Sequence, residues 1–320
     1  MSNAQLAFEY ARRRGFPHYN LTLDEMMKDY ATFKRFDISK IVAPDNTVQQ
    51  TQHCAGVCWS YFPHHWNVRT RKNKTPMDVW NDDTLLLKAI QSRIKWGGKV
   101  ALDGTMSDAD LRKAVRTYSG VQRVSGFRPS ASAGIYHHYC KEGSTVWDMS
   151  AGFGGRLLGA VRSGKVKTYI GNDPSTPTFN GLQALAKDFG FIDIILNKSG
   201  SENWKPDREV DLCFTSPPYF NTEVYSNDPE QSCHKFTQVE AWNEGFLRET
   251  IRNCKSVLKQ DGKMLLNVAD VITHKTLEAD TVRIAQEEGF GLKETLQLKL
   301  SSITKGGFKF EPIFVFELSK

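Results

Sequence analysis

Apolar residues follow helical spacing over the first third of the 320-residue chain, and a different pattern takes over near residue 120. Residues 23–36 and 77–96 each place apolar side chains on one face of an amphipathic helix. Ser107, with an acidic residue three positions later, is typical of the N-cap of a further helix. Residues 49–66 are rich in Gln, His, Cys and aromatic residues and show no clear period. The pattern predicts a mainly helical N-terminal region over residues 1–120.

From residue 121 onward, short apolar runs alternate with helical patterns, which is typical of a doubly wound, mostly parallel sheet. The expected strands are 145–148, 167–171, 192–196, 211–215, 263–268, 296–300 and 312–318. The expected helices are 130–140, 157–163, 238–258 and 279–288. Because no helix separates the last two strands, we expect them to pair antiparallel. The sequence therefore predicts an α/β domain over residues 121–320.

Polar turns follow the first three expected strands of this domain. Residues 150–156, Ser-Ala-Gly-Phe-Gly-Gly-Arg, form a glycine-rich turn that leads into a helix. Such a turn lets the backbone approach a ligand, with the N–H groups of the helix N-terminus directed at it. The second strand ends at Asp173, where a carboxylate would hold a ribose diol, and the third ends in residues 198–202. These turns predict a ligand site at the carboxyl edge of the sheet, although the glycine turn alone would also suit a dehydrogenase.

The fourth expected strand ends abruptly in Ser216-Pro217-Pro218-Tyr219. Two consecutive prolines cannot donate to a strand ladder, and they stiffen the turn. The turn therefore offers a rigid rim of oxygen acceptors beside a flat aromatic ring, which suits a planar group with N–H donors. A dehydrogenase would not explain this feature. The alternative is a proline turn that serves only the fold.

The glycine turn, the acidic end of the second strand and Ser-Pro-Pro-Tyr, in this order, resemble the class I DNA amino-methyltransferases. The resemblance covers roughly residues 120–320. It implies a Rossmann-like sheet of seven strands, mostly parallel, with an antiparallel last strand, and S-adenosylmethionine as the cofactor. The implied catalytic residues are Ser216, Pro217, Pro218 and Tyr219. The implied cofactor-binding residues are Phe127, Asp148, Ser150, Gly152, Gly154, Asp173 and Ser201.

Within this resemblance, the cofactor residues divide by the part of S-adenosylmethionine that they would contact. Asp148 and the two glycines, Gly152 and Gly154, would surround the methionine moiety, while Asp173 would hold the ribose. Ser201 stands at the position of the adenine contact, where the family often has aspartate. Phe127 corresponds to an upstream aromatic residue that completes the pocket, and Met149 replaces a frequent proline.

The resemblance also implies a mechanism. Ser216 Oγ and the Pro217 carbonyl would accept the two hydrogens of an exocyclic amine, which supplies orientation and electrostatic stabilisation. Tyr219 would stack on a base that is flipped from a duplex or comes from a single strand. Serine at the first motif position resembles cytosine-N4 enzymes more than adenine-N6 enzymes. Glu223, in the loop that follows, and Phe308, in a late loop, are candidate substrate contacts, each with plain solvation or packing as the alternative.

Charge adds a candidate partner. The net charge of +6 permits nucleic acid without requiring it. The densest positive run is Arg69, Arg71, Lys72 and Lys74, which we consider for phosphate contacts, with solvated surface as the default. DNA is the preferred partner and RNA the second. The sequence has neither a long apolar run nor the apolar centre of a signal peptide, so we expect a cytoplasmic protein that does not enter a membrane.

Six cysteines are scattered along the chain and suit a reducing compartment. Cys54 and Cys58, with His64 and His65 nearby, could bind zinc, but their spacing is loose and a second cysteine pair is missing. We therefore expect a histidine-rich packing patch in this segment and no metal in the active site.

The sequence thus predicts a site-specific DNA methyltransferase that acts on an exocyclic amino group, with cytosine N4 favoured over adenine N6. An RNA methyltransferase, or another base-modifying enzyme on the same fold, is the second hypothesis. A non-catalytic nucleic-acid-binding protein is the third, and the intact glycine turn, Asp173 and Ser-Pro-Pro-Tyr argue against it. Protein-glutamine enzymes carry Asn-Pro-Pro-Tyr, which Ser216 contradicts. With no long insertion after the motif, target recognition falls to residues 1–120 or to the loops.

Overall fold

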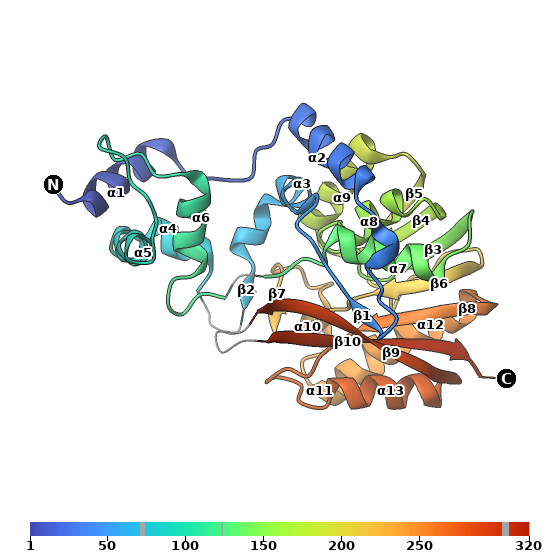
Figure 1. Cartoon of the computed structure of the whole chain (residues 1–320). Helices are drawn as coiled ribbons and strands as arrows, with labels where there is room; N and C mark the ends of the chain where they lie inside the picture. Colours follow the sequence, from blue (N-terminus) through green and yellow to red (C-terminus); the bar gives the residue numbers. More distant parts are fainter. Residues whose placement is uncertain (71–73, 123, 303–306, 320) are drawn as a thin grey trace. The chain divides into compact units, whose positions relative to one another are not determined.

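The computed structural model describes residues 1–70, 74–122, 124–302 and 307–319 (Figure 1). It divides into two compact units, each assembled from separate stretches of chain. The helical unit consists of Met1–Asn20, Pro63–Ser125 and Glu223–Tyr225, and the sheet unit of Leu21–Phe62, Gly126–Thr222 and Ser226–Lys320. Residues 21–62 therefore belong with the sheet, whereas the expected boundary near residue 120 grouped them with the N-terminal helices.

An eight-stranded sheet forms the core of the sheet unit, in the order β1-β9-β10-β8-β6-β3-β4-β5. Its strands are β1 (Thr47–Val48), β3 (Ser144–Asp148), β4 (Val166–Asn172), β5 (Asp193–Asn197), β6 (Val210–Thr215), β8 (Leu258–Asn267), β9 (Phe290–Ser302) and β10 (Phe308–Leu318). Strand β3 is parallel to both β4 and β6, and the chain order reverses between β3 and β6. The carboxyl ends of these three strands meet at one edge of the sheet, which is where doubly wound folds bind ligands.

The last strand, β10, runs antiparallel to both of its neighbours, with Val315 opposite Leu265 of β8 and Ile313 opposite Leu296 of β9. The predicted α/β fold, a mostly parallel sheet with an antiparallel last strand, is confirmed. The expected number of seven strands is wrong, because β1 pairs parallel with the far side of β9. Two residues are too short a run for an alternating pattern, so the sequence did not reveal this strand.

Helices surround the sheet, with α11, α12 and α13 on one side and α7, α8 and α9 on the other (Figure 1). The helices of the sheet unit are α2 (Leu23–Arg35), α3 (Ala55–Tyr61), α7 (Pro129–Tyr139), α8 (Gly155–Ser163), α9 (Thr176–Phe189), α10 (Ser232–Lys235), α11 (Val239–Trp242), α12 (Glu249–Val257) and α13 (Leu277–Glu287). A π-helical segment, Asn243–Arg248, joins α11 to α12, so the helix expected over 238–258 is continuous but not regular. Its Trp242 and Ile251 pack with Trp147 and Met264 of the strands in one buried core.

Residues 21–62 join the sheet unit through close contacts with α7 and α8. Arg162 of α8 donates to the Phe33 carbonyl at 2.9 Å and to the Phe36 carbonyl at 2.6 Å, so it satisfies the C-terminal end of α2. Gly134 of α7 lies against Ile41, and a Cβ at that position would approach the Ile41 side chain to 2.3 Å. These contacts join distant parts of the chain, which is why the change of pattern near residue 120 did not predict them.

The helical unit contains α1 (Asn3–Arg14), α4 (Pro76–Asn81), α5 (Asp83–Lys95) and α6 (Asp108–Arg116), together with the 3-10 turn Pro63–Asn67 and the short pair β2 (Arg69–Thr70) and β7 (Glu223–Val224). The single helix expected over 77–96 is wrong. Asp82 is extended, with φ −98° and ψ 117°, and its side chain accepts the Leu85 N–H at 2.9 Å to cap a new helix. In the described part of the chain, we find no helix long and apolar enough to cross a membrane.

Candidate active site

A buried carboxylate joins the ends of three central strands. Asp148, the last residue of β3, is 0% exposed. Its Oδ2 accepts hydrogen bonds from Arg156 Nε at 2.9 Å and from the Tyr169 hydroxyl of β4 at 2.7 Å. Its Oδ1 accepts from Thr215 Oγ1 of β6 at 2.9 Å and from the Ser150 N–H at 3.3 Å. Asp148 was expected to contact the cofactor, but both of its carboxylate oxygens accept hydrogen bonds from protein donors. These hydrogen bonds fix the positions of the surrounding turns.

Arg156 extends this network along the glycine turn. Its Nη2 donates to the Ser150 carbonyl and, at 3.3 Å, to Thr215 Oγ1. Burial, followed by the nearby charge of Asp148, raises the pKa of Tyr169 well above its ordinary value, so the phenol remains a donor. The buried ion pair therefore has hydrogen-bond partners on all sides, which is the condition under which such a pair is tolerated in a core.

The glycine turn has the geometry that a close ligand approach requires. Gly152 has φ 54° and Gly154 has φ 70°, both in the left-handed region that favours glycine. A Cβ at Gly154 would lie 2.4 Å from the Leu185 side chain, so this position tolerates no larger residue. At Gly152 the space is open, since the nearest atom to an added Cβ is the Ser150 carbonyl oxygen at 3.7 Å. The backbone at Gly152 is therefore accessible to a ligand.

Asp173 follows β4 and lies directly across from this turn. Its Oδ2 accepts the Gly152 N–H at 3.1 Å and its Oδ1 accepts the Ser175 N–H at 3.0 Å. Each carboxylate oxygen can accept a second hydrogen bond, so both retain capacity for ligand hydroxyls. Burial raises the pKa of Asp173 to about 6, and the two backbone hydrogen bonds only partly oppose that shift. The structure thus brings Gly152 and Asp173 together, as the sequence predicted.

Beside the turn lies a small aromatic pocket, whose lining includes Trp59 of α3, Phe127 and Phe153. The ring centroids of Trp59 and Phe153 are 5.4 Å apart, and Arg156 lies 5.6 Å from the centroid of Phe127. Phe127 was expected here, whereas Trp59 and its neighbour Cys58 were not. They belong to the Cys- and aromatic-rich segment that showed no period. The composition of this segment was the only indication of a role in the site, because the segment reaches the glycine turn only in the folded chain.

Ser201 is placed differently from the expectation. Its side chain is 1% exposed, and its hydroxyl forms a hydrogen bond of 2.8 Å with Thr250 Oγ1 of α12. Its carbonyl accepts a hydrogen bond from Asn253 of the same helix. The Ser201 hydroxyl therefore helps to dock the third turn onto α12.

The Ser-Pro-Pro-Tyr turn begins directly after Thr215, the β6 residue that contacts Asp148. Pro217 is buried, while Ser216, Pro218 and Tyr219 are partly exposed. Ser216 Oγ lies 3.4 Å from the Tyr219 hydroxyl, which donates to the Asn267 carbonyl of β8 at 3.2 Å. The predicted catalytic serine therefore follows immediately after a residue of the network that orders the glycine turn.

Two contacts hold the Tyr219 side chain in position. Besides the Asn267 carbonyl, Tyr219 forms a hydrogen bond with Glu311 of β10, and burial raises the pKa of that carboxyl. The following residue, Phe220, is buried with φ 54°, a rare conformation for a non-glycine residue. Its ring packs edge-on against Trp242 at 6.1 Å, and this burial stabilises the sharp turn.

The remaining candidate substrate residues belong to other elements. Glu223 and Arg69 belong to the helical unit, in the paired strands β7 and β2, and the Tyr225 hydroxyl donates to Glu223. Lys74 of that unit is exposed. Arg71 and Lys72 lie outside the described residues. Phe308, the first residue of β10, is 45% exposed, and Lys299 Nζ lies 3.7 Å from its ring centroid.

All six cysteines are buried and free. Burial raises the pKa of Cys58 to about 12, so in the metal-free protein this residue is a neutral thiol. Among the described residues, no group of three or more His, Cys, Asp or Glu side chains could hold a metal ion.

Known proteins provide a comparison for this geometry. Residues 210–317, which include Ser-Pro-Pro-Tyr, match the N6/N4 methyltransferase family described as DNA methylase. No curated protein matches the sequence.

Three solved structures illustrate the structural likeness. TrmN from Thermus thermophilus is 16% identical with a TM-score of 0.44, over 59% of this chain and 48% of TrmN. YcgJ from Bacillus subtilis is 13% identical with a TM-score of 0.42, over 59% of this chain and 98% of YcgJ. Ribosomal protein L11 methylase from Lactobacillus delbrueckii subsp. bulgaricus is 17% identical with a TM-score of 0.39, over 60% of this chain and 79% of that enzyme. This chain thus spans about half the length of TrmN.

The family match covers Ser-Pro-Pro-Tyr and the last strands of the sheet. The resemblance predicted from Ser216-Pro217-Pro218-Tyr219 is therefore confirmed over these residues. The similarity to the N4/N6 DNA methylase family is thus found over residues 210–317.

Proposed function

We propose that the protein methylates an exocyclic amino group of a DNA base, with cytosine N4 favoured over adenine N6. The observation that carries this proposal is the hydrogen bond of 2.9 Å between Thr215 and Asp148. It ties the residue before Ser-Pro-Pro-Tyr to the strand end that begins the glycine turn. A methyl donor at one turn and an amine at the other would thereby be held in a fixed geometry, which is the main requirement of a direct transfer.

The residues around the glycine turn fit S-adenosylmethionine, which when bound supplies an electrophilic methyl group on a sulfonium. Asp173 has one remaining acceptor site on each oxygen, as bidentate binding of a ribose diol requires. Gly152 faces open space and leaves its backbone accessible. Trp59, Phe127 and Phe153 supply aromatic rings beside the turn, and aromatic faces attract cations such as a sulfonium.

In this proposal, Ser216 and Pro217 bind the exocyclic amine of the target base. An exocyclic amine is a weak nucleophile because its lone pair is delocalised into the base. Ser216 Oγ and the Pro217 carbonyl would each accept a hydrogen bond from one N–H of the amine. These hydrogen bonds would favour a more tetrahedral nitrogen, with the lone pair directed at the methyl group. The rigid proline turn keeps these acceptors in place, so they stabilise the transition state without reorganisation.

In this proposal, Tyr219 stacks on the ring of the target base. Its hydroxyl is held by Asn267 and Glu311, so the ring has a fixed orientation and can serve as a stacking platform. A base inside a duplex cannot reach such a turn, and the substrate base is therefore flipped out or single-stranded. Serine as the first motif residue favours cytosine N4.

Mass spectrometry of nucleosides tests the proposal. Cytosine- and adenine-containing DNA and RNA are incubated with the protein and methyl-labelled S-adenosylmethionine, then digested. We expect labelled N4-methylcytosine from DNA. Label in N6-methyladenine would overturn the cytosine preference, and label confined to RNA would overturn the DNA assignment. With DNA and RNA both unlabelled while the cofactor binds, methylation of a nucleic-acid base would be excluded.

A further inference from the structure

The positive charge of the chain is concentrated in the helical unit. Its three stretches contain 15 Lys and Arg against 8 Asp and Glu, a net charge of +7, whereas the whole chain carries +6. The sheet unit, with its methyltransferase fold, is therefore close to neutral. A polyanion such as DNA is attracted over long range by net charge, so the helical unit would dominate such attraction.

Helix α5 concentrates this charge on one face. Lys88, Gln91, Ser92 and Lys95 recur at helical spacing and are all exposed, and after Asp83 the helix contains no acidic residue. The opposite face, with Leu86, Ala89 and Ile90, is buried in the unit. Among the residues that the structure describes, neither Lys88 nor Lys95 has an ion-pair partner. Within α5 the face therefore offers cations and amide or hydroxyl donors, while Asp110 of α6, beside Lys99, is paired with Arg93.

An exposed tryptophan stands at the end of this face. Trp96 is 77% exposed, which is unusual for so large an apolar side chain, and Lys99 follows it closely and is also exposed. The backbone of Trp96 is anchored, because Arg93 donates to the Trp96 carbonyl at 2.9 Å and to Asp110 at 2.7 Å. The ring is thus presented on a fixed backbone, which reduces the entropy lost when it contacts a ligand.

We propose that the α5 face, defined as Lys88, Gln91, Ser92, Lys95, Trp96 and Lys99, is the surface through which the protein binds DNA. The lysines would contact phosphates, Gln91 and Ser92 would donate to the backbone or to base edges, and Trp96 would contact a base or sugar. This inference rests on the proposed function and adds a recognition surface outside the residues that match the methylase family. Lysines without an ion-pair partner beside an aromatic ring favour nucleic acid over a protein partner, whose surface would mix both charges.

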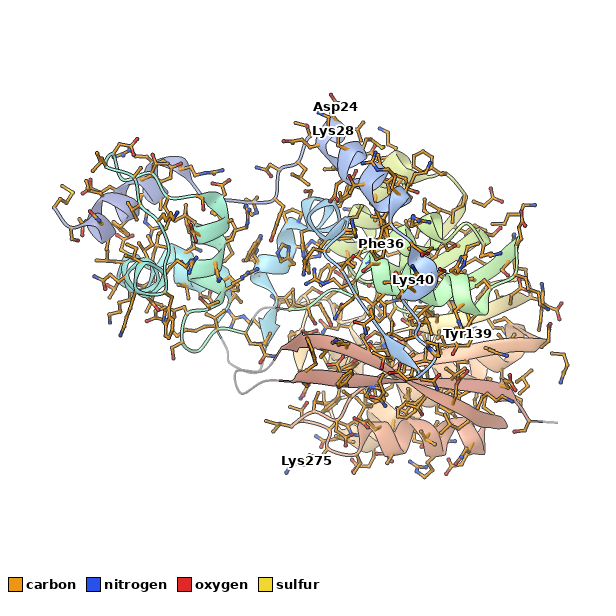
Figure 2. The ribbon with its side chains drawn as sticks, viewed as in Figure 1. Asp24, Lys28, Phe36, Lys40, Tyr139 and Lys275 are labelled. Atoms are coloured by element: carbon orange, nitrogen blue, oxygen red, sulfur yellow. The ribbon has the colours of Figure 1, made fainter. Side chains whose placement is uncertain are left out.

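Equilibrium binding of a labelled DNA duplex to the full chain, measured across a range of salt concentrations, tests the surface. The variant carries Lys88→Gln, Lys95→Gln and Lys99→Gln. Its matched control carries Lys28→Gln, Lys167→Gln and Lys187→Gln, which removes the same charge from exposed positions of the sheet unit (Lys28 is labelled in Figure 2). We expect the slope of log affinity against log salt to flatten by about 2–3 in the variant and to change little in the control.

A second variant separates the aromatic contact from charge. Trp96→Ala is expected to weaken DNA binding by about 5- to 100-fold at fixed salt while leaving the salt slope unchanged, since it removes no charge. S-adenosylmethionine affinity, measured by calorimetry, should match the wild type in every variant, and urea unfolding of each variant serves as the test of folding. Equal DNA binding by the lysine variant and its control would overturn the proposal that the α5 face binds DNA. If the wild type methylated DNA all the same, the proposed function would stand without it.

Discussion

Asp173→Asn should make the protein more stable while weakening its cofactor binding. Burial raises the pKa of Asp173 from 3.8 to about 6, so the ionised form is disfavoured in the native state. A shift of about two units corresponds to about 3 kcal/mol of stability that the ionised carboxylate costs. Asparagine removes that charge. It offers only one acceptor oxygen, so either the Gly152 or the Ser175 N–H loses its partner, at a cost of about 1–2 kcal/mol. We expect a net gain of about 1–2 kcal/mol.

The pH dependence identifies the cause. An acid whose native pKa lies above its unfolded value binds more protons when folded, so wild-type stability falls as the pH rises from about 4 to about 6 and is flat above. The asparagine side chain of the variant does not titrate. The advantage of the variant should therefore be largest near pH 8 and should shrink or reverse toward pH 4. Urea unfolding of the cofactor-free proteins at several pH values measures this difference.

Cofactor binding should change in the opposite direction. The wild-type carboxylate must be ionised to accept both ribose hydroxyls, so S-adenosylmethionine affinity should fall as the pH drops below about 6. In the variant, affinity should be lower by about 1.5–3 kcal/mol at neutral pH and should lose this pH dependence. A variant no more stable than the wild type near pH 8 would refute the buried-charge reasoning. Unchanged cofactor affinity would remove Asp173 from the ribose site.

Three further substitutions test the two turns. Ser216→Ala keeps the prolines and should lower the single-turnover methylation rate by roughly 10²-fold or more with unchanged cofactor affinity, because it removes one of two acceptors for the amine; a native rate would make the turn structural. Tyr219→Ala should weaken DNA engagement by about 1–3 kcal/mol in a binding titration, the range for one base–aromatic stack; equal affinity would exclude stacking. Arg156→Met should destabilise the protein by about 3–5 kcal/mol in urea, since it leaves Asp148 buried without its partner. The double variant with Asp148→Asn should lose less than the sum of the two single changes, and strict additivity would argue against the ion pair.

The parts of the site that the sequence predicted are those encoded by local turns. Gly152, Asp173 and Ser216 each follow a recognisable apolar strand, and parallel strands bring such turns to one edge. Their backbone conformations also follow from residue type, since glycine tolerates positive φ and proline ends a ladder. Short-range chemistry was therefore enough to predict that these turns lie at one edge of the sheet.

What the sequence could not predict depends on contacts between distant segments. Tyr169 resembles an ordinary strand residue until β4 pairs with β3 and brings its hydroxyl to Asp148. Trp59 reaches the glycine turn only because α3 packs on the sheet unit. Ser201 matches the adenine position in the order of motifs, yet its hydroxyl is directed to Thr250. Side-chain direction and long-range docking are set by packing, which periodicity does not report.

The division of the chain into units has a consequence for how the protein can be dissected or could have evolved. The backbone passes from one unit to the other after Asn20, Phe62, Ser125, Thr222 and Tyr225. A single cut therefore releases neither unit intact, and truncation near residue 120 would also remove β1 from the sheet and α3 from the aromatic pocket. Genetic exchange of the helical unit would require coordinated replacement of three segments. The two units therefore cannot be separated or exchanged at a single boundary in the sequence.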